Sequence, residues 1–130
     1  MIEEHIKPRF CETDALGHIN NTVLAQWFEG AREPIFQWFT PALDINQWSL
    51  ILARILVDFH AELKYGQAVT LKTYISRIGN SSFDVYQEAW QQGIKCASGT
   101  ATMVYFDYKQ KKSKKITNDI TDKMSKHAVD

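Results

Sequence analysis

Between residues 22 and 39, apolar side chains recur every three or four positions, at Val23, Leu24, Trp27, Phe28, Ala31, Ile35, Phe36 and Phe39. This spacing predicts a helix with a wide apolar face. We expect Asn20 or Asn21 to be its N-cap and Thr40 to end it, because Pro41 follows. Pro34 falls inside the stretch and predicts a kink. A helix this apolar requires other elements to cover it.

The segment from residue 51 to residue 63 alternates, with apolar residues at Ile51, Ala53, Ile55, Val57, Phe59, Ala61 and Leu63. Alternation of this kind predicts a long strand with two different faces. Further strands are expected at residues 69–77, 82–90 and 94–107, separated by the turns 79–81 and 91–93. Short connections of this kind indicate antiparallel neighbours.

The two ends of the chain complete the expected fold. Residues 5–12 are a candidate fifth strand, which Pro8 restricts to an edge or a bulge. Residues 109–115 form a basic loop, and residues 117–127 are a candidate short helix. The order of strand, long helix and four strands predicts an α+β class with the antiparallel sheet curled around the helix. No linker interrupts residues 1–130, so we expect a single domain.

Composition excludes several function classes. Lys and Arg total 15 and Asp and Glu total 15, so nothing global favours binding to nucleic acid or to an anionic membrane. The first ten residues lack the pattern of a secretory signal. Cys11 and Cys96 match no metal spacing, and an isolated pair indicates reduced thiols. We therefore expect a cytoplasmic protein without a metal site.

Candidate chemistry is concentrated just before the predicted helix. Asp14 stands three positions before Gly17, a turn glycine, and His18 follows directly. A carboxylate ahead of a helix N-terminus pairs a base or nucleophile with free backbone N–H donors. This pairing suits attack on a carbonyl whose oxygen must take up negative charge.

The stretch Thr13-Asp14-Ala15-Leu16-Gly17-His18-Ile19-Asn20-Asn21, followed by Glu29 and Arg32, closely resembles the signature of hotdog-fold acyl-CoA thioesterases of the 4-hydroxybenzoyl-CoA thioesterase-like family. The resemblance extends through residues 53–55, 58–59, 65–66 and 78–83, to about Asp107. It implies a five-stranded antiparallel sheet around a central helix. It also implies a homodimer or homotetramer of edge-joined sheets, with active sites at the subunit interface.

The resemblance makes Asp14 the catalytic carboxylate, acting as nucleophile or as general base for water. It places the thioester oxygen at the backbone N–H groups of Asn21 and Thr22 in the first helical turn. Gly17 permits a tight turn that lets substrate approach the backbone. His18 either positions Asp14 or substrate, or packs the loop.

Three helix residues are assigned supporting roles. Asn20 is expected to cap the helix and to bond within the loop. Relatives often carry a tyrosine where Leu24 stands, which implies a more apolar acyl pocket here. Glu29 either reaches an active site or a neighbouring subunit, or is a carboxylate at the interface whose hydrogen-bonding partners are already in place.

Arg54, on the polar face of the first long strand, either forms a cross-strand or interface ion pair, or binds the cofactor portion of the substrate or braces the active-site loop. The resemblance places Ser81 and Ser82 near the pantetheine tunnel. The implied reaction is hydrolysis of an acyl-CoA, with coenzyme A as part of the substrate and no separate cofactor. The alternatives are an acyl-carrier-protein thioesterase and a non-catalytic acyl-CoA binder.

Overall fold

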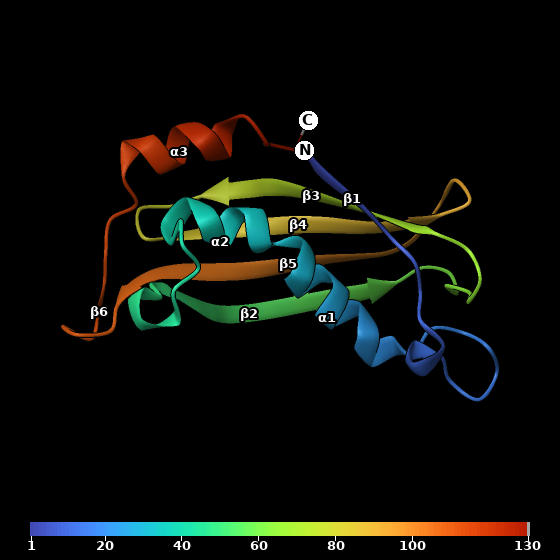
Figure 1. The fold of residues 1–130 in the computed structure, drawn as a ribbon. Coiled ribbons are helices and arrows are strands. Elements are labelled where there is room, and N and C mark those ends of the chain that lie inside the picture. Colours follow the sequence, from blue (N-terminus) through green and yellow to red (C-terminus); the bar gives the residue numbers. More distant parts are fainter. Residues whose placement is uncertain (130) are drawn as a thin grey trace.

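The computed structural model describes residues 1–129, so Asp130, the last residue of the expected single domain, lies outside the described part. Five strands form one antiparallel sheet in the order β1-β3-β4-β5-β2, and the short strand β6 pairs with β5 (Figure 1). The strands are β1 (Ile2–Ile6), β2 (Leu50–Phe59), β3 (Val69–Ile78), β4 (Ser82–Gln91), β5 (Ile94–Asp107) and β6 (Lys112–Ser113). The helices lie on one side of the curled sheet, which confirms the expected α+β class.

Two strand boundaries differ from the expectation. The N-terminal strand is Ile2–Ile6, not residues 5–12, because Pro8 ends the extended segment and Phe10–Glu12 forms a 3₁₀ turn. This strand does lie at a sheet edge, paired only with β3 in the described sheet. The strand expected to reach residue 63 ends at Phe59.

The predicted helix is divided into α1 (Asn21–Ala31) and α2 (Glu33–Phe39), with Arg32 between them. Asn20 is the N-cap, because its side-chain oxygen accepts the Thr22 N–H at 3.0 Å. Pro34 lies in the first turn of α2, where a missing N–H costs nothing. The kink prediction is confirmed, whereas a single continuous helix was wrong.

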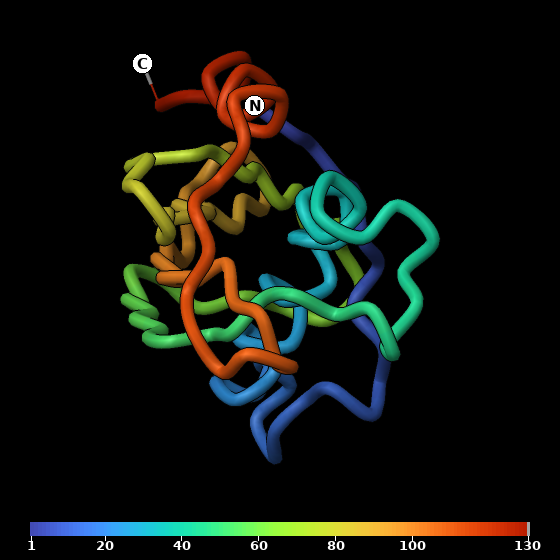
Figure 2. Tube along the Cα trace, turned by 90° about the vertical axis from the view of Figure 1, so that its left-hand side faces the viewer, coloured from blue at the N-terminus to red at the C-terminus, as the bar shows by residue number. Residues whose placement is uncertain are grey.

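Seen along the strands in Figure 2, α1 and α2 pack against the sheet, and α3 (Asn118–Ser125) covers one end. The helix layer lies close to the sheet at Gly99, where a Cβ atom would lie 3.1 Å from the Phe28 ring. Phe28 is 1% exposed and belongs to the core cluster on this face of the sheet. Because β5 has no side chain at this position, α1 can lie close to the middle of the sheet.

The apolar alternation in β2 is interrupted by a bulge between Leu52 and Arg54. Leu50 and Leu52 precede the bulge and share the helix-facing side of the sheet with Ile55 and Val57, which follow it. The prediction that the odd positions from residue 51 share one face was therefore wrong before the bulge. A bulge inserts one residue and shifts the alternation of faces by one.

Candidate active site

Asp14 lies in a tight turn between the 3₁₀ turn Phe10–Glu12 and the start of α1. Its Oδ1 atom accepts hydrogen bonds from the backbone N–H groups of Leu16, at 2.7 Å, and His18, at 3.1 Å. Gly17 completes the turn with a φ of +80°, which glycine adopts without steric cost. The loop therefore holds one carboxylate oxygen and leaves Oδ2 for other contacts.

Glu12 connects this loop to α1. Its buried carboxylate accepts hydrogen bonds from the Arg9 N–H at 2.7 Å and from Trp27 Nε1 at 2.8 Å. Its carbonyl accepts the Asn20 N–H at 2.9 Å. Burial raises the pKa of Glu12, but the hydrogen bonds and the Arg9 charge outweigh burial and hold the pKa below its usual value. The ionised Glu12 thus fixes the loop against the helix.

His18 lies between two carboxylates. Its Nε2 atom is 3.0 Å from Glu62 Oε2, and its Nδ1 atom is 3.8 Å from Asp14 Oδ2. The first distance is that of an ion pair when His18 is protonated, and the second is too long for a hydrogen bond. An isolated β-bridge to Lys64 holds the His18 backbone in place. The contact with Glu62 orients the imidazole so that Nδ1 is turned toward Asp14.

A cavity of about 430 Å³ opens between this loop, the N-terminus of α1 and the segment after β2. Its lining includes Asp14, His18, Asn21, Leu24, Phe59 and Glu62. Asn21 is the first helical residue, so its N–H has no partner within the helix. The Thr22 N–H, in contrast, is donated to the Asn20 side chain. Of the two expected oxyanion donors, Asn21 is the one left for a ligand.

The remaining expected site residues lie elsewhere in the chain. Ser82 pairs with Val104 and Phe59 pairs with Ala97, so about 24 Å of β5 separates the Ser81-Ser82 turn from the Asp14 cavity. The Ser82 hydroxyl accepts a hydrogen bond from the exposed Arg77, at the end of the sheet away from Asp14.

Arg54 and Glu29 are also apart from Asp14. Arg54 pairs with Thr102, on the face of the sheet that points away from α1. Hydrogen bonding from Arg77 holds the pKa of Asp84 low, and the charge of Arg54 contributes to a smaller extent. Glu29 is exposed and lines a different cavity.

The sequence interpretation missed three residues that line this cavity, Phe59, His60 and Glu62, and it missed Glu12, which fixes the Asp14 loop to α1. Glu62 and His60 lie outside the signature stretch and reach the site because the chain turns back after β2, where the N–H groups of His60 and Ala61 donate to the Cys96 carbonyl. For Glu12, a signal was its position two residues before Asp14, within the same loop.

No group of three or more His, Cys, Asp or Glu side chains placed to hold a metal ion occurs among residues 1–129. None of the helices in this part of the chain is long and apolar enough to cross a membrane. The polar groups that line the cavity are the carboxylates of Asp14 and Glu62, the imidazoles of His18 and His60, and Asn21 at the N-terminus of α1.

The model of the thioesterase-like superfamily matches residues 8–124. The chain belongs to this superfamily. A search of curated proteins found no match. The solved structure of a predicted thioesterase from Bacillus stearothermophilus is 41% identical, covers 98% of this chain and 96% of that chain, and has a TM-score of 0.94.

Two more distant structures share the fold. A thioesterase from Thermus thermophilus, complexed with coenzyme A and Zn, is 23% identical over 95% of this chain and 91% of that chain, with a TM-score of 0.83. A gentisyl-coenzyme A thioesterase is 20% identical over 92% of this chain and 96% of that chain, with a TM-score of 0.77. These matches confirm the expected hotdog fold, and membership of the superfamily supports thioesterase activity.

Proposed function

We propose that this protein is an acyl-CoA thioesterase that hydrolyses the thioester to a free acid and coenzyme A. The observation that carries the proposal is the Asp14 carboxylate, which has one oxygen fixed by the Leu16 and His18 N–H groups and the other beside the cavity. The same cavity holds the N-terminus of α1. A binding protein has no need of a carboxylate at this position, which favours catalysis over simple acyl-CoA binding.

In the proposed reaction, the thioester carbonyl oxygen accepts a hydrogen bond from the Asn21 N–H, supported by the positive end of α1. Asp14 Oδ2 either attacks the carbonyl carbon or removes a proton from an attacking water. The C–S bond then breaks and coenzyme A leaves as the thiolate. If water was the nucleophile, the acid is formed directly and Asp14 passes the proton it removed to the thiolate. If Asp14 was the nucleophile, water hydrolyses the resulting acyl-Asp14 anhydride, which releases the acid, regenerates the Asp14 carboxylate and provides the proton for the thiolate. Coenzyme A is part of the substrate, and the chemistry needs no further cofactor.

His18 acts as a positioning residue in this scheme. Its Nε2 contact with Glu62, at 3.0 Å, sets the ring plane and directs Nδ1 toward Asp14 Oδ2. A modest movement of either side chain closes the 3.8 Å gap to a hydrogen bond. Such a bond would hold Oδ2 in the direction of the substrate.

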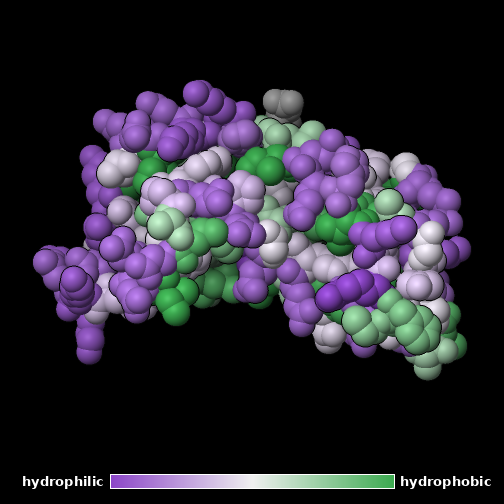
Figure 3. All heavy atoms as spheres, in the orientation of Figure 1, coloured by the Kyte–Doolittle hydropathy of each residue, from purple (hydrophilic) through white to green (hydrophobic). Residues whose placement is uncertain are grey.

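We further propose that two subunits join along β2, which is an edge of the described sheet. This strand exposes Leu52 (43%), Ile55 (42%), Leu56 (46%) and Phe59 (51%), a pattern that an edge strand facing water avoids. Apolar side chains are visible along the lower edge of the molecule in Figure 3, where β2 runs in Figure 1. A twofold axis through the middle of β2 pairs the strand with its own copy in antiparallel order.

This pairing bears on the residues that lie far from Asp14 within one chain. It places the start of β2 in one subunit beside the end of β2 in its partner. The Ser81-Ser82 turn lies near the start of β2, because Tyr105 bonds to Ser81 and pairs with Leu50. The arrangement therefore brings that turn toward the partner's cavity, as the expected pantetheine role requires.

The test is Asp14→Asn, compared with the parent protein on a panel of acyl-CoAs, with release of free thiol as the readout. The Asn side chain keeps an oxygen to accept the Leu16 and His18 N–H groups, so the loop is expected to remain folded. Loss of the carboxylate is expected to lower kcat by about 10²- to 10⁴-fold. Asp122→Asn, which removes an exposed carboxylate on α3, is the matched control.

If Asp14→Asn hydrolyses as fast as the parent, the proposed role of Asp14 is wrong. If the parent releases no thiol from any acyl-CoA but cleaves the matched acyl-carrier-protein thioesters, the carrier is a protein. Binding without hydrolysis of either kind of substrate would instead indicate an acyl-CoA binder.

A further inference from the structure

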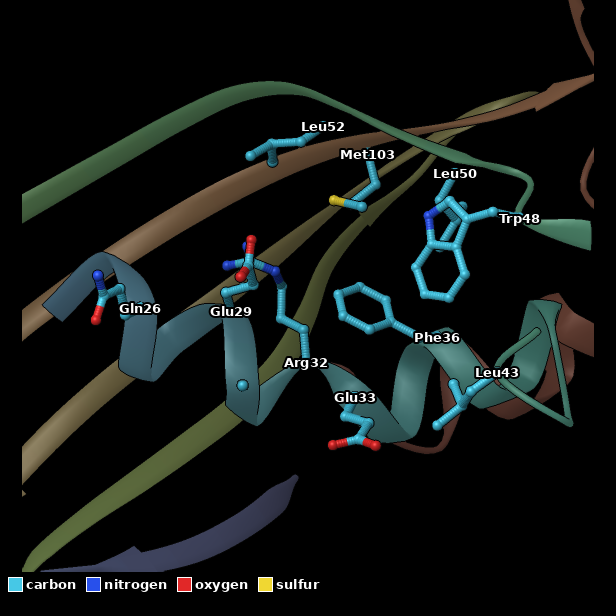
Figure 4. Close-up of a pocket in the computed structure, with 11 residues that line it drawn as sticks. Gln26, Glu29, Arg32, Glu33, Phe36, Leu43, Trp48, Leu50, Leu52 and Met103 are labelled. Carbon is cyan, nitrogen blue, oxygen red and sulfur yellow. The ribbon is translucent and has the colours of Figure 1, made fainter. Parts of the chain in front are cut away.

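A second cavity, of about 470 Å³, lies between the α1–α2 junction and the first part of β2 (Figure 4). Most of its wall is apolar and comes from Phe36, Leu43, Trp48, Leu50, Leu52 and Met103. Arg32 and Glu29 extend into it from the helix side. Apolar walls with a few placed polar groups are typical of sites for small molecules.

Arg32 is 2% exposed, yet much of its guanidinium lacks a partner. Nη1 donates to Gln87 Oε1 at 3.1 Å. Nε is buried and has no hydrogen-bond partner among residues 1–129, and Nη2 makes no hydrogen bond within the same range. No ion pair within 4.0 Å includes Arg32 in the described part of the chain.

A buried cation without a counter-ion is costly, because it has lost its hydration without gaining an opposite charge. Burial lowers the pKa of Arg32, and the charge of Glu29 opposes this only in part. The unpaired Nε–Nη2 edge has the geometry that binds a carboxylate through two parallel N–H···O bonds. The chain has therefore kept one strong anion-binding edge in a cavity whose wall is mostly apolar and whose other polar residues are Gln26, Glu29 and Glu33.

We infer that the cavity beside Arg32 binds a carboxylate at the far end of the acyl group, so that ω-carboxyacyl thioesters are the preferred substrates. The inference rests on the proposed function, whose reaction it leaves unchanged. The apolar wall takes the methylene chain, and Arg32 takes the terminal carboxylate. Glu29 lines the same cavity and competes with the ligand for the guanidinium.

The edge-joined dimer places this cavity near the chemistry. Within one chain, Arg32 follows Asn21 by about 16 Å of helix. Leu50 and Leu52 line the Arg32 cavity, and Phe59 lines the Asp14 cavity. Antiparallel pairing of two β2 strands therefore brings the Arg32 cavity of one subunit toward the Asp14 cavity of its partner. An acyl chain bound across the two subunits then has a shorter distance to span.

Hydrolysis provides the first test. The parent protein is assayed with succinyl-, adipoyl- and suberoyl-CoA and with the matched butyryl-, hexanoyl- and octanoyl-CoA. We expect a higher kcat/KM for at least one carboxylated member over its match. Arg32→Lys keeps the charge but loses the two-bond edge, and is expected to reduce this preference by about 10- to 100-fold.

Two exposed carboxylates provide a test that does not depend on the folding of an Arg32 variant. Glu29→Gln removes the competitor and is expected to raise the ratio of kcat/KM for each carboxylated substrate to that for its match by about two- to five-fold. Asp122→Asn, on α3, is the control and is expected to change neither series. No preference in the parent, or a preference that survives both Arg32→Lys and Glu29→Gln unchanged, overturns the inference.

Binding separates the failure of this inference from the failure of the proposed function. Free suberate is titrated into ¹⁵N-labelled protein, with octanoate as the control, and the side-chain Nε–H resonance of Arg32 is followed by NMR. A shift of this resonance with suberate alone supports the inference even if no acyl-CoA is hydrolysed. If thioesters are hydrolysed but suberate leaves the resonance unmoved, the proposed function stands and the carboxylate site does not.

Discussion

Replacement of Gln87 by leucine is expected to lower the free energy of unfolding by about 1.5–5 kcal/mol. Gln87 is 1% exposed in the middle of β4 and connects the sheet to the α1–α2 junction. Its Nε2 donates to the Phe28 carbonyl at 2.8 Å and to Thr73 Oγ1 at 3.1 Å. Its Oε1 accepts the only side-chain hydrogen bond that Arg32 donates within residues 1–129.

The magnitude follows from the groups that leucine leaves unpaired. The Phe28 carbonyl has no helical partner, because the Arg32 N–H at the break donates to the carbonyls of Glu29 and Gly30. A buried carbonyl without a partner costs about 1–3 kcal/mol, and loss of a hydrogen bond to a charged group costs about 1.5–3 kcal/mol. The Thr73 hydroxyl oxygen also loses its donor, but this is a neutral bond at 3.1 Å and adds less. Extra apolar burial by leucine returns about 1 kcal/mol.

The measurement is urea unfolding at a fixed protomer concentration, because subunit association would contribute to the apparent stability. Gln37→Leu, at an exposed position of α2, is the control and is expected to change stability by less than about 0.5 kcal/mol. Gln87→Glu gives Arg32 a carboxylate but removes the donor to Phe28, so it should recover about half of the loss. If Gln87→Leu unfolds within about 1 kcal/mol of the parent, the hydrogen bonds described here do not hold the helix break in place.

Three further changes test other parts of the structure. Gly99→Ala places a Cβ atom 2.9 Å from the Leu56 carbonyl of β2 and 3.1 Å from the Phe28 ring of α1, and should destabilise the fold by about 1–3 kcal/mol in thermal unfolding. Gly30→Ala is the control, because its Cβ atom meets nothing within 4 Å. Equal melting temperatures of the two variants would contradict the close packing around Gly99. Hydrogen bonding from Arg77 holds the pKa of Asp84 below its unfolded value near 3.9, so the pair stabilises the fold above roughly pH 4 and this stability is lost as the pH falls further. Asp84→Asn should therefore flatten the acid side of the stability curve, and an unchanged acid side would refute the linkage. Ile55→Lys puts a charge on the β2 edge and should yield monomers in sedimentation velocity with a kcat/KM reduced more than about 10-fold, while a fully active monomer would exclude a shared site.

Local patterns accounted for most of the fold. The strand 94–107 was predicted with its observed bounds, and the turn expected at residues 91–93 is the two residues Gln92 and Gly93, which have the positive φ angles of a tight hairpin, because Gln91 still belongs to β4. The division of the helix was less accessible. Pro34 indicated a kink, but the break at Arg32 also depends on Gln87, which is far away in sequence and satisfies the freed Phe28 carbonyl. A single sequence contains no local sign of that contact.

For the candidate site, the signature stretch placed Asp14, His18 and Asn21 around one cavity because all three belong to a short loop and the helix it leads into. Glu62 was missed because its contact with His18 depends on where the chain turns after β2. The expected donor Thr22 illustrates a different limit. The Asn20 side chain, which the sequence indicated as the N-cap, accepts the Thr22 N–H, so this N–H is not free for the substrate oxygen.

The β2 strand links the remaining differences between pattern and structure. Its alternating apolar residues predict burial, yet Ile55 and Phe59 remain 42% and 51% exposed in the single chain. Apolar side chains that alternate along a strand but stay exposed in the single chain are typical of a strand at a subunit interface, because they become buried only in the assembled protein. Glu29 and the Ser81-Ser82 turn lie far from Asp14 in the same subunit, and antiparallel pairing of β2 is the operation that reduces both separations at once. The exposed edge strand and the distant residues thus agree with the proposed dimer, in which each active site would be built from two chains.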